Sequence, residues 1–242
     1  MKMMHLFKAA ICFLLLGQMV GCSSAEGEPN TLSEQEQKEG WTLLFDGKSF
    51  DKWHIYNAGS PAGSAWQIRN GEIYCDPDNE SQKGDLVTNE EFENYELKFQ
   101  WKLMKEGNSG VFINVLETPE LNATWHSGPE YQLLDDAHAD YDVFAKRSGC
   151  LYTFAPQKNL ANNKVRTEWN NSRIVQKGGK VQFYLNDILT AEMDFKSKAW
   201  FDKIEKSHFR DFPEFGKHTK GKIALQDWSR GVSFRNIKIK TL

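Results

Sequence analysis

The stretch NYELKFQWKL (residues 94–103) decides the fold class, because its apolar and polar residues alternate without a break. A period of two places the apolar side chains on one face of a β-strand and the polar ones on the other. The pattern therefore predicts a half-buried strand whose core-facing residues are Tyr95, Leu97, Phe99, Trp101 and Leu103.

Two turn sequences between strand-like runs predict hairpins. WQIR-NG-EIYC (66–75) places Asn-Gly between two such runs, and RIVQ-KGGK-VQFYL (173–185) places Gly-Gly in the same position. These residue pairs accept the positive φ angles that a two-residue hairpin turn requires.

The remaining pattern completes an all-β chain. Only KAWFDKIEKSHF (198–209) has a helical pattern, and a doubly wound sheet would need helices between its strands. No second linker interrupts the chain from Trp41 to Leu242, so we expect one domain with a sandwich or jelly-roll fold. Further short strands are expected at SGVFINVL (109–116), LYTF (151–154), KIAL (222–225) and VSFRNIKI (232–239).

The amino-terminal residues predict export. Lys2 and Lys8 precede an apolar run that ends before Cys22, which is typical of a secretory signal over residues 1–21. A cysteine directly after the cleavage point resembles the lipobox of bacterial lipoproteins, so Cys22 is the predicted lipidation site, with a plain signal peptide as the alternative. Ser23 and Ser24 favour the outer membrane of the cell envelope, and residues 22–38 are polar enough for a tether.

Composition narrows the function class. Without the signal, the chain has 28 basic and 33 acidic residues, and no basic block of the kind that nucleic-acid-binding proteins carry. No G-x-G-x-x-G opens a helix after a strand, so a nucleotide cofactor is not expected. Cys75 and Cys150 remain in an oxidising compartment, where they are either a disulfide or two buried thiols.

The segment GPEYQLLDD (128–136) combines strand-like apolar residues with polar ones that suit a pocket. Glu130 and Gln132 share one strand face, and a β-bulge would bring Asp135 beside them. The spacing is similar to the E-x-D-x-x-E strand of laminarinase-type glycanases. Gln132 in the middle cannot ionise, which argues against an ordinary retaining glycosidase.

Two further groups of residues leave alternatives open. Asp135, Asp136, His138 and Asp140 could hold a divalent cation or supply a general base, or they could form a solvated acidic loop. His138 is suited to proton transfer near neutral pH. The loop-like tryptophans are either sugar-stacking residues or fillers of the sandwich ends, and they are Trp125, Trp169 and Trp228.

Six motifs together resemble the 3-keto-disaccharide hydrolase domain family, which is common in Bacteroidota lipoproteins. The resemblance covers residues 39–242. The motifs are GWTLLFDGKSFDKW (40–53), EGNSGVFINV (106–115), WHSGPEYQLLDD (125–136), RSGCLYTF (147–154), EWNNSRIV (168–175) and FGKHTKGKIALQDWSRGVSFRNIKIK (215–240).

The resemblance implies a concanavalin-like (laminarinase-like) jelly roll that cleaves glycosides already oxidised to a ketone at sugar carbon 3. The ketone acidifies the proton on C2, so one base can form an enolate that expels the C1 substituent, and water then adds. A separate sugar 3-dehydrogenase would supply the oxidised substrate.

The resemblance also implies roles for individual residues. His138 or Glu130 is expected to be the base, and Arg147 to stabilise the enolate charge. The expected substrate contacts are Asn108, Ser109, Asn114, Trp125, Gln132, Asp135, Tyr152, Trp169, Asn170, Gln226 and Asp227.

Two other functions remain compatible with the sequence. A jelly roll can be a non-catalytic sugar-binding module, because the fold alone does not decide between binding and catalysis. A conventional glycoside hydrolase is the other alternative, and Gln132 argues against it.

Overall fold

The alternating segment forms β6 (Tyr95–Leu103), a long strand in the middle of an antiparallel sheet. The computed structural model describes residues 27–79 and 82–242; the predicted signal peptide and Cys22 lie outside them. Sheet A has the order β11-β10-β9-β6-β13-β4-β3, with β1 paired to β13. Its other strands are β1 (Thr42–Leu43), β3 (Trp66–Arg69), β4 (Glu72–Cys75), β9 (Asn170–Lys177), β10 (Lys180–Leu185), β11 (Ile188–Asp194) and β13 (Val232–Thr241).

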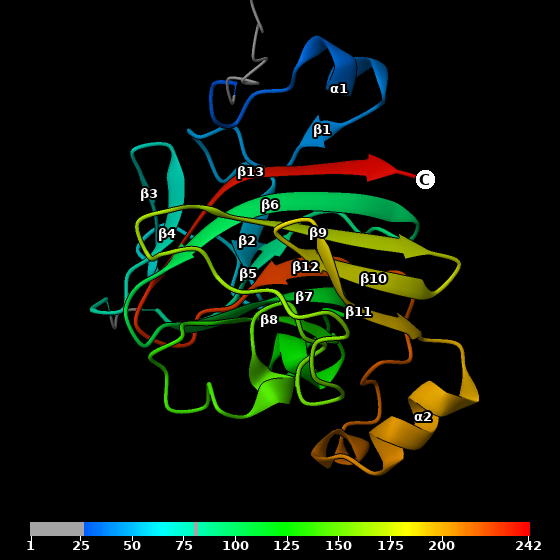
Figure 1. The fold of residues 1–242 in the computed structure, drawn as a ribbon. Coiled ribbons are helices and arrows are strands. Elements are labelled where there is room, and N and C mark those ends of the chain that lie inside the picture. The colour runs from blue at the N-terminus through cyan, green and yellow to red at the C-terminus, as the bar shows by residue number, and fades with distance from the viewer. Residues whose placement is uncertain (1–26, 80–81) are drawn as a thin grey trace, which may run out of the picture.

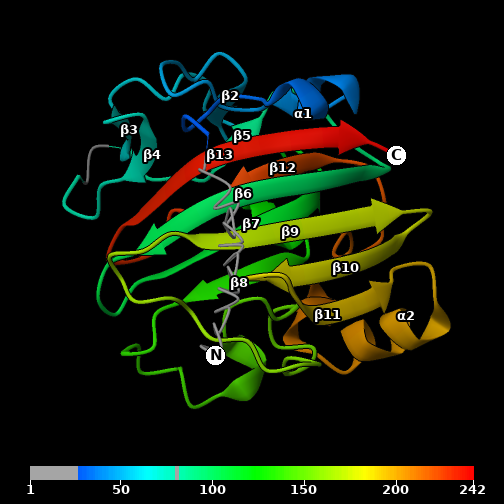
Figure 2. The same cartoon turned by 45° about the horizontal axis from the view of Figure 1, so that its top comes forward.

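Five strands form the second sheet, sheet B, in the order β2-β5-β12-β7-β8. Both sheets are antiparallel throughout, and Figure 2 shows β9 and β10 of sheet A in front of β7 and β8 of sheet B. The chain is one all-β domain with a concanavalin-like jelly-roll fold, as the strand pattern and the resemblance predict. The strands of sheet B are β2 (Trp53–Ile55), β5 (Leu86–Thr88), β7 (Asn108–Val115), β8 (Glu130–Leu134) and β12 (Lys222–Leu225).

The few helices lie outside the sheets (Figure 1). None of them, within the part of the chain that the structure describes, is long and apolar enough to cross a membrane. They are α1 (Glu34–Lys38), α2 (Lys198–Glu205) and the short 3-10 helices η1 (Thr124–His126), η2 (Phe144–Lys146) and η3 (His208–Asp211).

Tyr131 of β8 shows how the two sheets are joined. Its ring packs edge-on against Phe99 of sheet A, with ring centres 5.6 Å apart. Its hydroxyl lies 2.8 Å from Oγ of Ser172 and donates to the carbonyl of Tyr184, so the buried phenol keeps its hydrogen bonds. Since successive side chains of a strand alternate, Glu130 and Gln132 point away from the core, to the outer face of sheet B.

Both predicted hairpins are confirmed. Asn70 and Gly71 join β3 to β4 with φ angles of 52° and 75°, and Gly178 and Gly179 join β9 to β10 with 61° and 88°. These positive values are those of a type I′ turn, whose twist matches that of the flanking strands.

The prediction of a strand at LYTF is wrong. Leu151 makes a single bridge to Tyr131, and the chain then turns. Thr153 has φ 63°, a left-handed conformation that cannot continue a strand. The predicted helix over 198–209 divides into α2 and η3, because the hydroxyl of Ser207 accepts from the N–H of Phe209 and begins the second helix.

The cysteine alternatives are resolved in favour of two buried thiols. Cys75 donates to Oδ1 of Asp227 across 3.3 Å, and Cys150 donates to the carbonyl of Phe144 across 3.3 Å. Each thiol therefore has its own acceptor.

The segment before the domain is partly attached to it. Ser33 and Glu36 form a capping box at the start of α1, and Glu36 pairs with Lys238 of β13. Asn30 is buried; its backbone N–H donates to Oδ1 of Asn236, and its own Oδ1 accepts from the backbone N–H of Asn236. Residues 30–38, expected as tether, thus contact sheet A.

Candidate active site

One row of Cα partners crosses the outer face of sheet B from edge to edge. In the antiparallel register His54 of β2 pairs with Val87, Val87 with Ala224, Ala224 with Phe112, and Phe112 with Glu130 of β8. Paired residues point to the same side of a sheet. His54 and Glu130 therefore share this face, with three apolar residues between them.

A cavity of about 390 Å³ opens at the Glu130 end of this face. This volume is within the range of small-molecule sites, roughly 300–1,000 Å³. We call it the Glu130 cavity. Its walls come from β7, β8, the short helices η1 and η3 and neighbouring loops, and are formed by Asn108, Trp125, Glu130, Gln132, Asp140, Tyr152, His208, Phe209, Phe212, Gln226 and Trp228.

Glycine at position 110 makes room for the Glu130 carboxyl group. Gly110 lies beside Gln132 in the register, and a Cβ on it would stand 2.0 Å from Oε1 of Glu130. The carboxyl group thus lies directly over the backbone of β7. Any larger residue at 110 would displace it.

Glu130 is buried without full hydrogen bonding. It is 8% exposed, and its Oε1 has no hydrogen-bond partner among residues 27–79 and 82–242. Burial, with a smaller contribution from the charge of Asp85, raises the pKa of Glu130 well above its usual range. A carboxyl group of this kind is a stronger base when ionised than one in water.

Asp85 is held close behind this group. Thr124 donates a short hydrogen bond to Oδ2 of Asp85, and the N–H of Asp227 donates to Oδ1 across 2.9 Å. Burial raises the pKa of Asp85 to about 6. These bonds fix the position of Asp85. When Asp85 is ionised, its negative charge disfavours ionisation of Glu130.

Amide side chains line the cavity next to Glu130. Nε2 of Gln132 donates to Oδ1 of Asn108 across 2.8 Å. This bond fixes which edge of Asn108 is its oxygen, so its Nδ2 can act as a donor to a ligand. Oε1 of Gln226 is buried and has no partner in the described part of the chain, so the cavity holds a second unused acceptor.

Aromatic rings form an apolar wall. Trp125 packs edge-on against Phe212 with ring centres 4.7 Å apart, and Phe209 stacks on Phe215 at 4.0 Å. Aromatic faces beside amides and a carboxyl group suit a sugar, whose C–H groups stack while its hydroxyls form hydrogen bonds.

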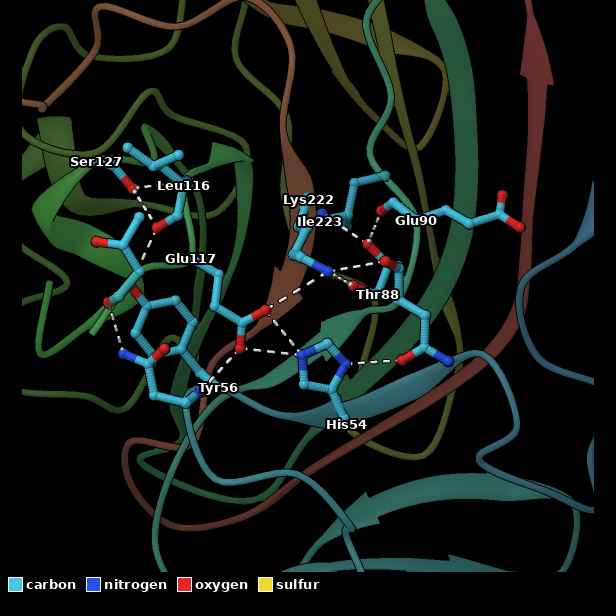
Figure 3. Close-up of polar contacts among 12 residues, drawn as sticks. His54, Tyr56, Thr88, Glu90, Leu116, Glu117, Ser127, Lys222 and Ile223 are labelled. Carbon is cyan, nitrogen blue, oxygen red and sulfur yellow. Dashed lines mark hydrogen bonds and ion pairs between the residues drawn. The ribbon is translucent and has the colours of Figure 1, made fainter. Parts of the chain in front are cut away.

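A polar cluster around His54 and Glu117 lies at the other end of the face (Figure 3). Nε2 of His54 lies 2.8 Å from Oε2 of Glu117, and its Nδ1 lies 2.7 Å from Oδ1 of Asn89. Lys222 contacts Glu117 at 3.5 Å and donates to the carbonyls of Thr88 and Asn89. We call these side chains the His54 cluster.

The His54 cluster is fully paired. Burial raises the pKa of Glu117, but hydrogen bonds from the N–H of Asn57 and from His54, with Lys222 nearby, outweigh it and leave the pKa below its usual range. The polar groups of the cluster therefore form hydrogen bonds and ion pairs with one another. Because Glu117 belongs to the 116–127 loop, these contacts hold the start of that loop in place.

Six of the predicted site residues line the Glu130 cavity. Their side chains come from β7, β8, η1 and two loops, and they are Asn108, Trp125, Glu130, Gln132, Tyr152 and Gln226.

The predicted bulge is absent, and Asp135 does not join Glu130. The pairing of β7 with β8 runs without a shift from Glu130 to Leu134, and the strand then ends. The carboxyl group of Asp135 accepts from the N–H of Glu106 and forms an ion pair with Arg166 at 2.7 Å. These bonds hold the pKa of Asp135 below its usual range against the raising effect of burial.

His138 and Arg147 lie outside the walls of the cavity. Nδ1 of His138 accepts from the N–H of Asp140 within its own loop. The Arg147 guanidinium lies over the rings of Tyr141 and Phe144, 4.5 and 4.3 Å from their centres. Both side chains are therefore engaged by the loop that follows β8.

Three predicted contacts belong to other parts of the fold. Nδ2 of Asn114 donates to Gln176 of sheet A, between the sheets. Trp169 lies under Lys102 and Arg235 of sheet A, and Oδ1 of Asn170 accepts from the backbone of the preceding loop. The polar groups of Asn114 and Asn170 and the ring face of Trp169 are therefore already in contact with other residues of the protein.

The two remaining predicted residues support the site from behind. Oγ of Ser109 donates to the carbonyl of Gln226 across 2.8 Å, which fixes the backbone beside the cavity. Asp227 accepts from the N–H of Gly84 and from Cys75, and its own N–H bonds Asp85. Ser109 and Asp227 therefore help to hold the residues of the cavity in place.

Sequence reasoning missed the wall contributed by η3. His208, Phe209 and Phe212 line the cavity, although their segment has only a helical pattern. Asp140, which the sequence marked only as part of the acidic loop, also lines the cavity and pairs with Lys146 at 2.9 Å. Ser207, a capping residue within a supposed helix, is the one sequence signal that marks this segment as irregular.

The metal interpretation of the acidic loop gains no support. Within residues 27–79 and 82–242, no group of three or more His, Cys, Asp and Glu side chains is arranged to hold a metal ion. Asp135 and Asp136 are instead paired with Arg166.

A family model for the 3-keto-α-glucoside-1,2-lyase-like domain matches residues 40–240. The chain belongs to this family. The match covers the jelly roll and all walls of the Glu130 cavity, which confirms the resemblance seen in the sequence motifs.

The chain is similar to proteins of Bacteroides thetaiotaomicron and Parabacteroides distasonis. The 3-keto-disaccharide hydrolase of Bacteroides thetaiotaomicron is 29% identical over 291 aligned positions, covering 99% of this chain and 100% of that protein. A crystal structure of a candidate glycosyl hydrolase from Parabacteroides distasonis is 33% identical, with a TM-score of 0.80, over 89% of this chain and 100% of that one. A second structure from that organism, 23% identical with a TM-score of 0.63 over 84% and 99% of the two chains, shares the fold.

Proposed function

We propose that this chain cleaves 3-keto-glycosides by removing the C2 proton and eliminating the C1 substituent, with Glu130 as the base. Family membership supports a carbohydrate-cleaving enzyme. The observation that favours elimination is the buried carboxyl group of Glu130, whose Oε1 has no hydrogen-bond partner among the described residues. It is set among amides, with Gln132 where a retaining glycosidase would need a second carboxylate.

The chemistry follows from the ketone. The Glu130 carboxylate takes the C2 proton, and the C–H electrons form an enolate whose charge rests on the C3 oxygen. The enolate re-forms the ketone while the C1–O bond breaks, which leaves a C1–C2 double bond and the departing aglycone oxygen. Water then adds at C1 and returns a proton to C2, so the net result is hydrolysis.

Cavity residues fit the other tasks of this reaction. The Nδ2 edge of Asn108 can donate to the developing enolate oxygen, which lowers the barrier most in a buried site. His208 is the histidine of the cavity wall and can protonate the leaving oxygen. Oε1 of Gln226 accepts a sugar hydroxyl, and the aromatic wall stacks on the ring.

The test is release of a chromogenic aglycone from its 3-keto-glucoside and from the unoxidised glucoside, with and without a chelator. We expect release from the keto compound alone, and incorporation of solvent deuterium at C2 of the product. Release from the unoxidised glucoside would instead support a conventional glycosidase. Sugar binding without any release would support a binding module, and chelator sensitivity would show that a cation takes part.

We also propose that the enzyme works in the cell envelope, attached through lipid on Cys22, after a separate dehydrogenase has oxidised the sugar. The cysteine after the predicted signal supports the anchor. Replacement Cys22→Ala should move the protein from the membrane fraction to the soluble fraction, and retention at the membrane would contradict the proposal.

A further inference from the structure

A second cavity adjoins the Glu130 cavity. It measures about 250 Å³, and we call it the Trp228 cavity. The two cavities share Asn108 and Trp228 as lining residues, so they lie on either side of one boundary. A ligand longer than one ring could therefore extend from the first into the second.

Trp228 is presented at this boundary by a fixed backbone. Its side chain is 65% exposed, although burial of an indole is strongly favourable. Its neighbours are anchored: the N–H of Asp227 donates to Asp85 across 2.9 Å, and Ser229 exchanges backbone hydrogen bonds with Asn108 at 3.2 and 3.3 Å. An exposed indole on such a rigid turn is a preorganised stacking surface.

The chemistry of the Trp228 cavity suits hydroxyl groups. Lys83 and Arg230 provide cationic donors, and Asp78 provides an acceptor. The guanidinium of Arg230 is partly compensated by Glu106 at 3.4 Å. The indole face of Trp228 is thus surrounded by cationic donors and an anionic acceptor. Such surroundings suit a ligand ring with several hydroxyl groups better than an apolar ring.

We propose that the Trp228 cavity is the aglycone subsite and that it takes a second sugar ring, stacked on Trp228 and hydrogen-bonded by Lys83. The inference rests on the proposed function, because the leaving group must depart from C1 of a sugar held over Glu130. It assigns to Trp228 and Lys83 a role in choosing the aglycone and none in bond cleavage.

The test compares three 3-keto-glucosides whose aglycones are methyl, phenyl and glucosyl. Replacement Trp228→Ala should lower kcat/KM for the glucosyl compound about tenfold relative to the methyl compound. Replacement Lys83→Met should lower it about threefold to tenfold relative to the phenyl compound, which has a ring but no hydroxyls. Phe201→Ala, an exposed aromatic on α2, is the matched control and should change neither ratio.

Binding separates this inference from the proposed function. In a Glu130→Gln background, calorimetry should show that Trp228→Ala weakens the glucosyl compound about tenfold more than the methyl compound. If the wild type cleaves none of the three but this difference in binding holds, the proposed function fails and the subsite stands. Equal losses for all aglycones, or no loss, would overturn the subsite.

Discussion

Glu130 is a buried carboxyl group on β8, and Glu117 is a half-buried one in the loop after β7; the fold surrounds these two groups in opposite ways. Oε1 of Glu130 has no partner in the described chain, and the pKa of the group is raised. Glu117 accepts from His54 and Asn57 and lies beside Lys222, and its pKa is lowered. The first arrangement costs stability and, in the proposed mechanism, supplies the base; the second stabilises the fold.

The largest effect is expected for Glu130→Gln, which keeps the shape and removes the base. We expect kcat to fall by about 10³-fold or more, because general base catalysis contributes roughly 10²–10⁴-fold. In the wild type, kcat/KM should rise with pH through the raised pKa of Glu130, above the usual value of 4.5. The measurement is a pH profile of aglycone release.

The same variant should be more stable than the wild type at neutral pH. The folded pKa of Glu130 lies above the unfolded value, so the native state loses stability as pH rises from 4.5 through the folded pKa. Glutamine has no such penalty, and thermal unfolding should show a gain in stability at neutral pH that disappears below pH 4.5. A loss of stability at every pH would contradict this account of Glu130.

The next effect is expected for Gly110→Ala. Its Cβ would stand 2.0 Å from Oε1 of Glu130, so the carboxyl group must move. A displacement of about 1 Å can cost roughly 10²-fold in rate, and overpacking about 1–3 kcal/mol in stability. Steady-state kinetics and thermal unfolding measure both, and Gly27→Ala, where nothing lies within 4 Å, is the control. Unchanged kinetics would show that the position of Glu130 is not critical.

Replacement Glu117→Gln tests the paired carboxyl group. The folded pKa of Glu117 is lowered, so its contribution is present above the unfolded pKa of about 4.5 and is lost as pH falls through the folded value. We expect a loss of about 1–2 kcal/mol at neutral pH that shrinks in acid. Denaturant unfolding measures it.

The control for Glu117 is Glu214→Gln, in the more exposed pair of Glu214 with His218, also at 2.8 Å. An exposed pair contributes about 0–1 kcal/mol. If both variants lose the same stability, burial does not explain the difference between the two pairs.

The smallest effect is expected for His138→Ala, which tests whether His138 rather than Glu130 is the base. His138 lies outside the cavity walls, and its Nδ1 accepts a bond within its own loop. We expect aglycone release to change by less than about threefold, with a stability loss of about 1 kcal/mol. A loss as large as that of Glu130→Gln would make His138 the base.

Local sequence determined the strands and turns. Alternation in residues 94–103 gave β6, and positive-φ residues at 70–71 and 178–179 gave the hairpins, because these features depend on neighbours along the chain. Glu130 and Gln132 could be placed on one polar face for the same reason. The family motifs added the class of reaction.

Only the tertiary structure decided which polar groups share the cavity. The strand of Glu130 ends without a bulge, so Asp135 pairs with Arg166 instead. His208 reaches the cavity from a segment 78 positions later in the chain, and Gly110 matters only because β7 pairs with β8. Such contacts join residues far apart in sequence, and whether a carboxyl group is paired or left free depends on packing that no local pattern records.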